Sequence, residues 1–232
     1  QNLLAGTTRG IDWHYNLGVV VLGMLLVISI VAVLSFLILP LALYRGRRTR
    51  EVRLPALLFF VGLGLGYILV EVSLIQRFVL FLGHPTYALT VVVFLLLLSS
   101  GLGSASIRRP NLLLTLGAIV ALIALNALFI PKLLSIAVGL TFPLKLIISA
   151  LILIPLGFLM GMPFPRGLKL IAENETCTVE WAWAMNAGAS VLGSVMAMII
   201  AIHLGLTMTL VSAAIAYSLA AVCWECSKLR LR

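Results

Sequence analysis

The stretch Leu54 to Leu82 reads LPALLFFVGLGLGYILVEVSLIQRFVLFL, and its only charged residues are Glu71 and Arg77. An α-helix rises 1.5 Å per residue, so about 20 apolar residues cross the hydrocarbon core of a bilayer. This stretch is long enough and apolar enough to form one transmembrane helix. It is also the most polar of the apolar stretches in the chain.

The whole chain has the composition of a membrane protein. Its residues are 62% hydrophobic and 10% charged, with a mean hydropathy of +1.21, whereas soluble domains have about 45–50% apolar and about 25% charged residues. A water-soluble fold is therefore excluded. We predict an all-α polytopic transmembrane bundle of about seven spans in a single domain over residues 1–232. The spans are expected at about 17–44, 54–82, 87–106, 112–134, 143–162, 181–202 and 206–224.

Positive charge is distributed unevenly between the predicted loops. The chain has 16 Lys and Arg against 7 Asp and Glu. Twelve of the basic residues fall on one side of the predicted spans, and the other side has only Arg9, Lys132 and Lys145. By the positive-inside rule, this predicts an outer N-terminus and a cytoplasmic C-terminus in the inner (plasma) membrane. Because the charge lies in short loops, we attribute it to orientation and lipid headgroups and expect no nucleic-acid partner.

Polar groups inside the second span are the first candidates for function. Glu71, Gln76 and Arg77 lie within it, and Glu71 is 13 residues before His84. That spacing places Glu71 about 20 Å below the turn, near the bilayer centre. One interpretation is that neighbouring helices satisfy Glu71 and Arg77, which then only fix the packing. The other is that Glu71 carries a proton or binds a cation.

The sixth span offers polar groups at a similar depth. Asn186 and Ser190 are one turn apart on one face of this helix. Ser190 is 14 residues from Leu204, which gives it about the depth of Glu71. If the second and sixth spans are neighbours, we expect a hydrogen bond from this face to Glu71.

Glycines of the second and third spans indicate helix packing. Gly62, Gly64 and Gly66 follow no strand, so they are not a nucleotide-binding loop. Gly66 is 18 residues before His84, and Gly101 and Gly103 are 17 and 19 residues after it. In a tight hairpin, small residues would then lie opposite small residues, and we predict close contact between the two helices there.

The three histidines and the longest loop are further candidates. His14, His84 and His203 all fall on the predicted outer side, where they could bind a metal or haem. They are far apart in sequence and have no ligand spacing, so we predict neither a metal site nor a cofactor. Residues 166–180 form the most hydrophilic loop, which can hold a short surface helix.

Two stretches resemble a known family. Residues 60–87 read FVGLGLGYILVEVSLIQRFVLFLGHPTY, and GMPFP at 161–165 is followed by WAWAMN at 181–186. This combination is similar to the membrane region of bacterial spermidine synthase-like membrane proteins. The matching positions are Glu71, Gln76, Arg77, His84, Pro85, Pro163, Pro165, Trp181 and Asn186.

The resemblance implies an architecture in which such spans are fused to a Rossmann-type aminopropyltransferase-like domain. The catalytic residues of the family belong to that soluble domain, and no position of this chain matches them. The resemblance therefore implies a non-catalytic membrane domain or subunit that anchors or assembles a protein partner or fused soluble domain in the lipid bilayer. Two alternatives stay open: a small cation- or proton-coupled transporter using Glu71, and a membrane subunit of a larger redox or photosynthetic complex.

Overall fold

A computed structural model of the 232-residue chain describes residues 13–44, 54–106, 111–173 and 179–229. Every regular element in these ranges is a helix. The helices are α1 (Trp13–Tyr44), α2 (Leu54–Leu82), α3 (Pro85–Ala105), α4 (Leu112–Ala137), α5 (Phe142–Gly161), α6 (Pro163–Glu173), α7 (Val179–Leu204) and α8 (Leu206–Leu229).

Six of these helices are long and apolar enough to cross a membrane: α2, α3, α4, α5, α7 and α8. The seventh, α1, contributes the apolar segment Val20–Phe36. The predicted all-α polytopic bundle of about seven spans is therefore confirmed. The short helix expected in the hydrophilic loop is α6, which follows α5 after a break at Met162 and Pro163.

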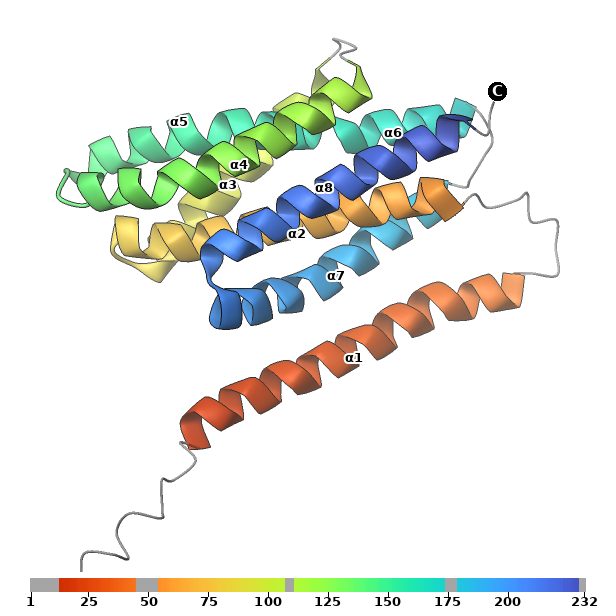
Figure 1. Cartoon of the computed structure of the whole chain (residues 1–232), viewed down its shortest axis with the longest axis horizontal. Helices are drawn as coiled ribbons and strands as arrows, with labels where there is room; N and C mark the ends of the chain where they lie inside the picture. The colour runs from red at the N-terminus through yellow and green to blue at the C-terminus, as the bar shows by residue number, and fades with distance from the viewer. Residues whose placement is uncertain (1–12, 45–53, 107–110, 174–178, 230–232) are drawn as a thin grey trace, which may run out of the picture.

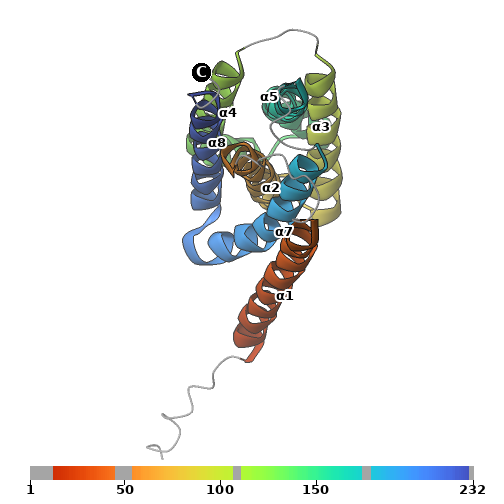
Figure 2. The same cartoon turned by 90° about the vertical axis from the view of Figure 1, so that its right-hand side faces the viewer.

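The bundle is built around α2. This helix contacts α3, α4, α5, α6, α7 and α8, whereas α1 contacts α7 alone among the described helices. Viewed from one end, α2 lies in the middle, with α3, α5, α8 and α7 around it and α1 outside α7 (Figure 2). The most polar span of the sequence is therefore the most enclosed one.

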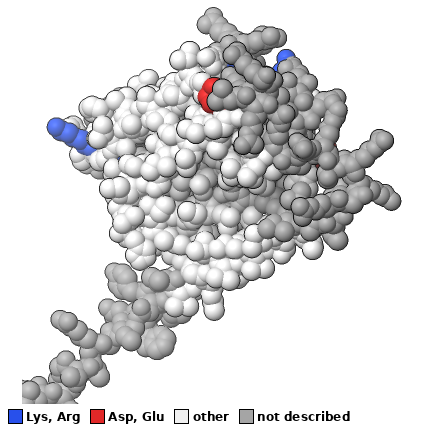
Figure 3. Space-filling model, turned by 45° about the vertical axis from the view of Figure 1, so that its right-hand side comes forward, with Lys and Arg blue, Asp and Glu red and all other residues white. Residues whose placement is uncertain are grey.

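The ends of the helices form two groups (Figure 1). The α2–α3, α4–α5 and α7–α8 turns lie at one end, here named the turn end, and the C-terminus lies at the opposite end. Gly83 and Gly205 allow two of these turns because both adopt a positive φ, 83° and 88°, which glycine tolerates without strain. Between the two ends, the face in Figure 3 presents uncharged side chains.

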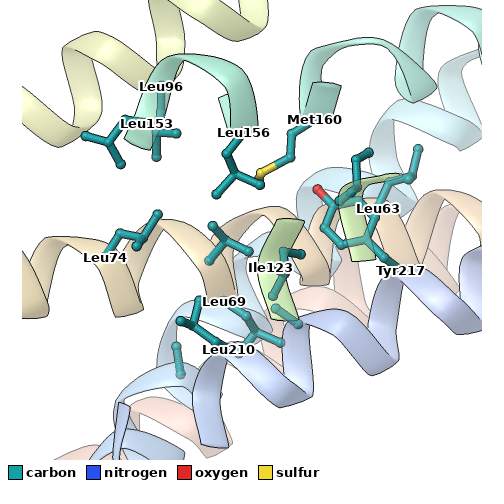
Figure 4. Close-up of a cluster of buried hydrophobic side chains, with 14 of the residues drawn as sticks. Leu63, Leu69, Leu74, Leu96, Ile123, Leu153, Leu156, Met160, Leu210 and Tyr217 are labelled. Atoms are coloured by element: carbon teal, nitrogen blue, oxygen red, sulfur yellow. The ribbon is translucent and has the colours of Figure 1, made fainter. Parts of the chain in front are cut away.

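The core is formed by large apolar side chains from several spans. Leu69 and Leu74 of α2 meet Ile123 of α4, Leu156 of α5 and Leu210 of α8, and none of the five is more than 1% exposed (Figure 4). Lipid tails are as apolar as these residues, so close packing rather than exclusion of water holds such helices together.

Glycines allow the closest approaches, but their partners differ from the prediction. A Cβ on Gly62 would lie 2.9 Å from the backbone of Ala216, and one on Gly66 would lie 2.7 Å from the ring of Tyr217. Both partners belong to α8. A Cβ on Gly103 would clash with the backbone of Phe158 on α5, and Gly101 has no heavy atom of another helix within 4 Å.

The predicted glycine contact between the second and third spans is therefore wrong. On α2, the faces that carry Gly62, Gly64 and Gly66 are turned toward α7 and α8, so α3 cannot use them. The hairpin spacing correctly matched positions along the two helices, but it contained no information on the direction in which each face points.

Gly103→Ala and Gly101→Ala form a matched pair for testing this packing. We expect Gly103→Ala to destabilise the protein by about 1–3 kcal/mol, because the added methyl group overlaps the α5 backbone. Gly101→Ala should be neutral or stabilise by up to about 1 kcal/mol, since alanine is the better helix former. Thermal unfolding of the purified variants in detergent measures both. Equal melting temperatures would contradict the α3–α5 contact.

Candidate functional site

Polar side chains of α7 bind the backbone of α2. Asn186 donates from Nδ2 to the carbonyl oxygen of Phe60 at 3.2 Å, and Ser190 donates from Oγ to that of Gly64 at 3.2 Å. Gly64 makes this approach possible, because a Cβ there would clash with Asn186. Both acceptors are backbone carbonyl oxygens of α2, so these bonds join the two helices without using any side chain of α2.

The expected hydrogen bond from Asn186 or Ser190 to Glu71 is therefore wrong. Ser190 lies beside Gly64, which is seven residues and about two helical turns before Glu71. The expectation assumed that the α2–α3 and α7–α8 turns lie at the same depth in the membrane. In the structure, the first residue of α8 lies beside Ser73, whose hydroxyl donates to the Leu206 carbonyl at 3.0 Å, so the α7–α8 turn falls well before the end of α2.

Gln76 and Arg77 have partners on the α7–α8 hairpin. Gln76 donates from Nε2 to the Met198 sulfur at 3.1 Å, and Arg77 donates from Nη2 to the Thr207 hydroxyl at 2.8 Å. Arg77 is only 9% exposed. These residues hold α2 to the hairpin, in agreement with the packing interpretation.

Glu71 has no such role. It lies one turn after Tyr67 and Ile68, and these two residues show which helices flank it. Ile68 faces α7, since it is the nearest neighbour of Gly193, and the Tyr67 hydroxyl lies near Ser100 of α3. Glu71 therefore lies on the strip of α2 between α3 and α7, which both contact α2 but do not contact each other.

The carboxyl group of Glu71 is half-buried, and its oxygen atoms are not among the fully buried polar atoms that lack a partner. Within the ranges that the structure describes, it makes no hydrogen bond and no ion pair. The nearby Tyr67 hydroxyl is buried, and no hydrogen bond of acceptable geometry satisfies it there either. Tyr67 was not singled out from the sequence, because a tyrosine inside an apolar run usually belongs to the core. Its position one turn before Glu71 was the available signal.

The three histidines are not brought together as ligands. His84 is the N-cap of α3, where its Nδ1 accepts a hydrogen bond from the Thr86 amide at 3.2 Å. His203 is exposed at the end of α7, and the side chain of His14 lies outside the described residues. No group of three metal-ligating side chains occurs in the described part of the chain.

An aromatic cluster at the end opposite the turns joins four helices. Phe60 of α2 packs edge-on against Phe164 of α6 at 5.5 Å, and Phe164 packs against Trp183 of α7 at 4.8 Å. Phe59 contacts Trp224 of α8 at 5.1 Å. The sequence analysis did not predict this cluster, because the only signal in the sequence is that aromatic residues occur near the ends of the predicted spans. It fixes α6 against the bundle.

Most residues on which the predicted family resemblance rests are thus accounted for by packing. Gln76, Arg77 and Asn186 bind neighbouring helices, and His84 with Pro85 starts α3. Glu71 is the charged residue of this set that makes no hydrogen bond in the described part of the chain, whereas Arg77 makes one to Thr207. Comparison of the chain with protein-family models, curated proteins and solved structures finds no match.

The capping role of His84 gives a direct test. We expect His84→Ala to destabilise the protein by about 1 kcal/mol, because the Thr86 amide loses its acceptor, and His84→Asp to retain wild-type stability. Thermal unfolding measures the difference. If the aspartate variant were as unstable as the alanine variant, His84 would have a role other than capping.

Proposed function

We propose that this chain is the membrane domain or subunit of a spermidine synthase-like protein, which anchors or assembles a partner and has no catalytic chemistry of its own. The proposal includes the inner membrane as its location, with the C-terminus in the cytoplasm. The motif residues support it, because all those with described contacts serve helix packing or capping.

The observation that carries the proposal is that the half-buried Glu71 makes no hydrogen bond in the described part of the chain. An ionisable side chain deep in a span is costly unless it is paired, protonated or open to water. Asn186, Ser190, Gln76 and Arg77 are each used elsewhere in the bundle. A donor from another polypeptide, entering between α3 and α7, would satisfy Glu71.

The same carboxyl group supports a second candidate, a proton- or cation-coupled transporter. Tyr67 and Glu71 place two oxygen atoms one turn apart on one strip of α2, and oxygen ligands suit protons and hard cations. The two candidates differ in what satisfies Glu71: a side chain of a partner in the first, and a mobile ion in the second.

Glu71→Gln separates the two candidates. If Glu71 holds a partner, the glutamine variant should reduce the partner recovered with the tagged chain in mild detergent by about tenfold or more, since an intramembrane charge-assisted bond is lost. Glu180→Gln is the matched control, because Glu180 is exposed at the start of α7. It should recover the partner normally.

Flux into proteoliposomes containing the purified chain is the second measurement. The anchoring proposal predicts no proton, cation or polyamine flux and no polyamine binding by the chain alone. Flux that Glu71→Gln abolishes, with an unchanged melting temperature, would establish the transporter instead. Normal partner recovery by Glu71→Gln would contradict the role of Glu71 in assembly.

A further inference from the structure

Arg77 is buried without a counter-charge. Its side chain is 9% exposed, its described hydrogen bond is to the neutral hydroxyl of Thr207, and its Nε atom is fully buried with no partner in the described part of the chain. A guanidinium ion does not lose its proton in proteins, so Arg77 cannot escape the cost of burial by becoming neutral. Such a charge calls for an anion.

Thr207, the hydrogen-bond partner of Arg77, lies at the N-terminus of α8, which is the positive end of the helix dipole. Thr207 is the second residue of α8, and the backbone N–H groups of a first turn have no acceptor within their own helix. The preceding residue, Gly205, has no side chain with which to cap them, and its own N–H bonds to the end of α7. The helix dipole adds positive potential at this point, so a charged side chain and a helix N-terminus of the same sign lie together.

No carboxylate among the described residues offsets this potential. Glu71 is six residues before Arg77 and therefore lies on a different face of α2. Glu173, Glu180 and Glu225 belong to α6, the start of α7 and the end of α8, at the end opposite the turns. The remaining acidic residues, Asp12, Glu51 and Glu175, lie outside the described ranges.

The first turn of α8 is open to the surroundings. Thr207 is exposed and Met208 is 50% exposed. The α7–α8 turn is set back along the bundle from the α2–α3 and α4–α5 turns (Figure 1). The first turn of α8 therefore lies at the level of Ser73 and Arg77 rather than at the end of α2, and its exposed residues leave it open to an anion that enters from the turn end.

We propose that a phosphate group binds between the Arg77 guanidinium and the first turn of α8. Guanidinium groups bind phosphate oxygens through paired N–H donors, and uncapped helix N-termini supply further backbone donors. A phospholipid headgroup and free phosphate share this chemistry. The site is independent of Glu71, which belongs to a different face of α2.

Thermal unfolding of the purified protein in detergent tests the site with three additives: inorganic phosphate, phosphatidylglycerol, and diacylglycerol, which lacks phosphate. A phosphate source at saturating concentration should raise the melting temperature of the wild type by about 5 °C, and diacylglycerol should not. A response to phosphatidylglycerol alone identifies a lipid headgroup as the ligand, and a response to inorganic phosphate identifies the free anion.

Two variants and a control make the test specific. Thr207→Asp puts a carboxylate in the first turn of α8 beside Arg77, so it should raise the melting temperature without phosphate and remove the phosphate response. Arg77→Gln should also remove the response. Lys145→Gln is the control, because Lys145 lies over the Phe81 ring, 5.5 Å from its centroid, and its loss removes a cation elsewhere in the bundle. It should keep the response.

The proposal is overturned if the wild type shows no phosphate response, or if Thr207→Asp responds as the wild type does. If the wild type shows no phosphate response and Asp12→Asn lowers the melting temperature as much as Arg77→Gln does, the counter-charge of Arg77 is Asp12 and the proposal is overturned. Thr207→Asp decides the question even if Arg77→Gln does not fold, since Thr207 is exposed and its replacement leaves Arg77 in place.

Discussion

The fold depends on the close contact between α2 and the α7–α8 hairpin. Gly62, Gly64 and Gly66 remove side-chain volume from α2, so that Asn186 and Ser190 reach its carbonyl oxygens and Ala216, Ala220 and Tyr217 pack against its backbone. Within a membrane, apolar burial does not favour one helix neighbour over another, whereas close packing and hydrogen bonds do. These contacts therefore select the neighbours of α2 and, through α2, the arrangement of α3, α4 and α5 around it.

This arrangement also explains why the polar groups of α2 have different roles. On the faces turned toward α7 and α8, Gln76 and Arg77 find partners on the hairpin. On the strip between α3 and α7, which do not contact each other, Glu71 finds none among the described residues. One helix thus combines packing residues with a carboxyl group that we propose is satisfied by another molecule.

Hydropathy alone predicted the helices well, because the length of an apolar run and the charges that end it are local properties. The partners of polar residues were harder to predict. Counting from the turns placed Ser190 level with Glu71, but α8 begins beside Ser73, so the count was displaced by about two turns. Which face a helix turns toward a neighbour, and how far two hairpins are offset, are set by packing between distant segments.

The central claim is that the Glu71 carboxyl group, which has no hydrogen-bond partner in the described part of the chain, is satisfied by another molecule in the assembled protein. Infrared spectroscopy in the carboxyl-stretching region measures this directly, with the Glu71 band identified by its loss in Glu71→Gln. We predict that the band shifts or disappears when the purified chain is reconstituted with its partner. An identical Glu71 band in the isolated and assembled protein would contradict the claim.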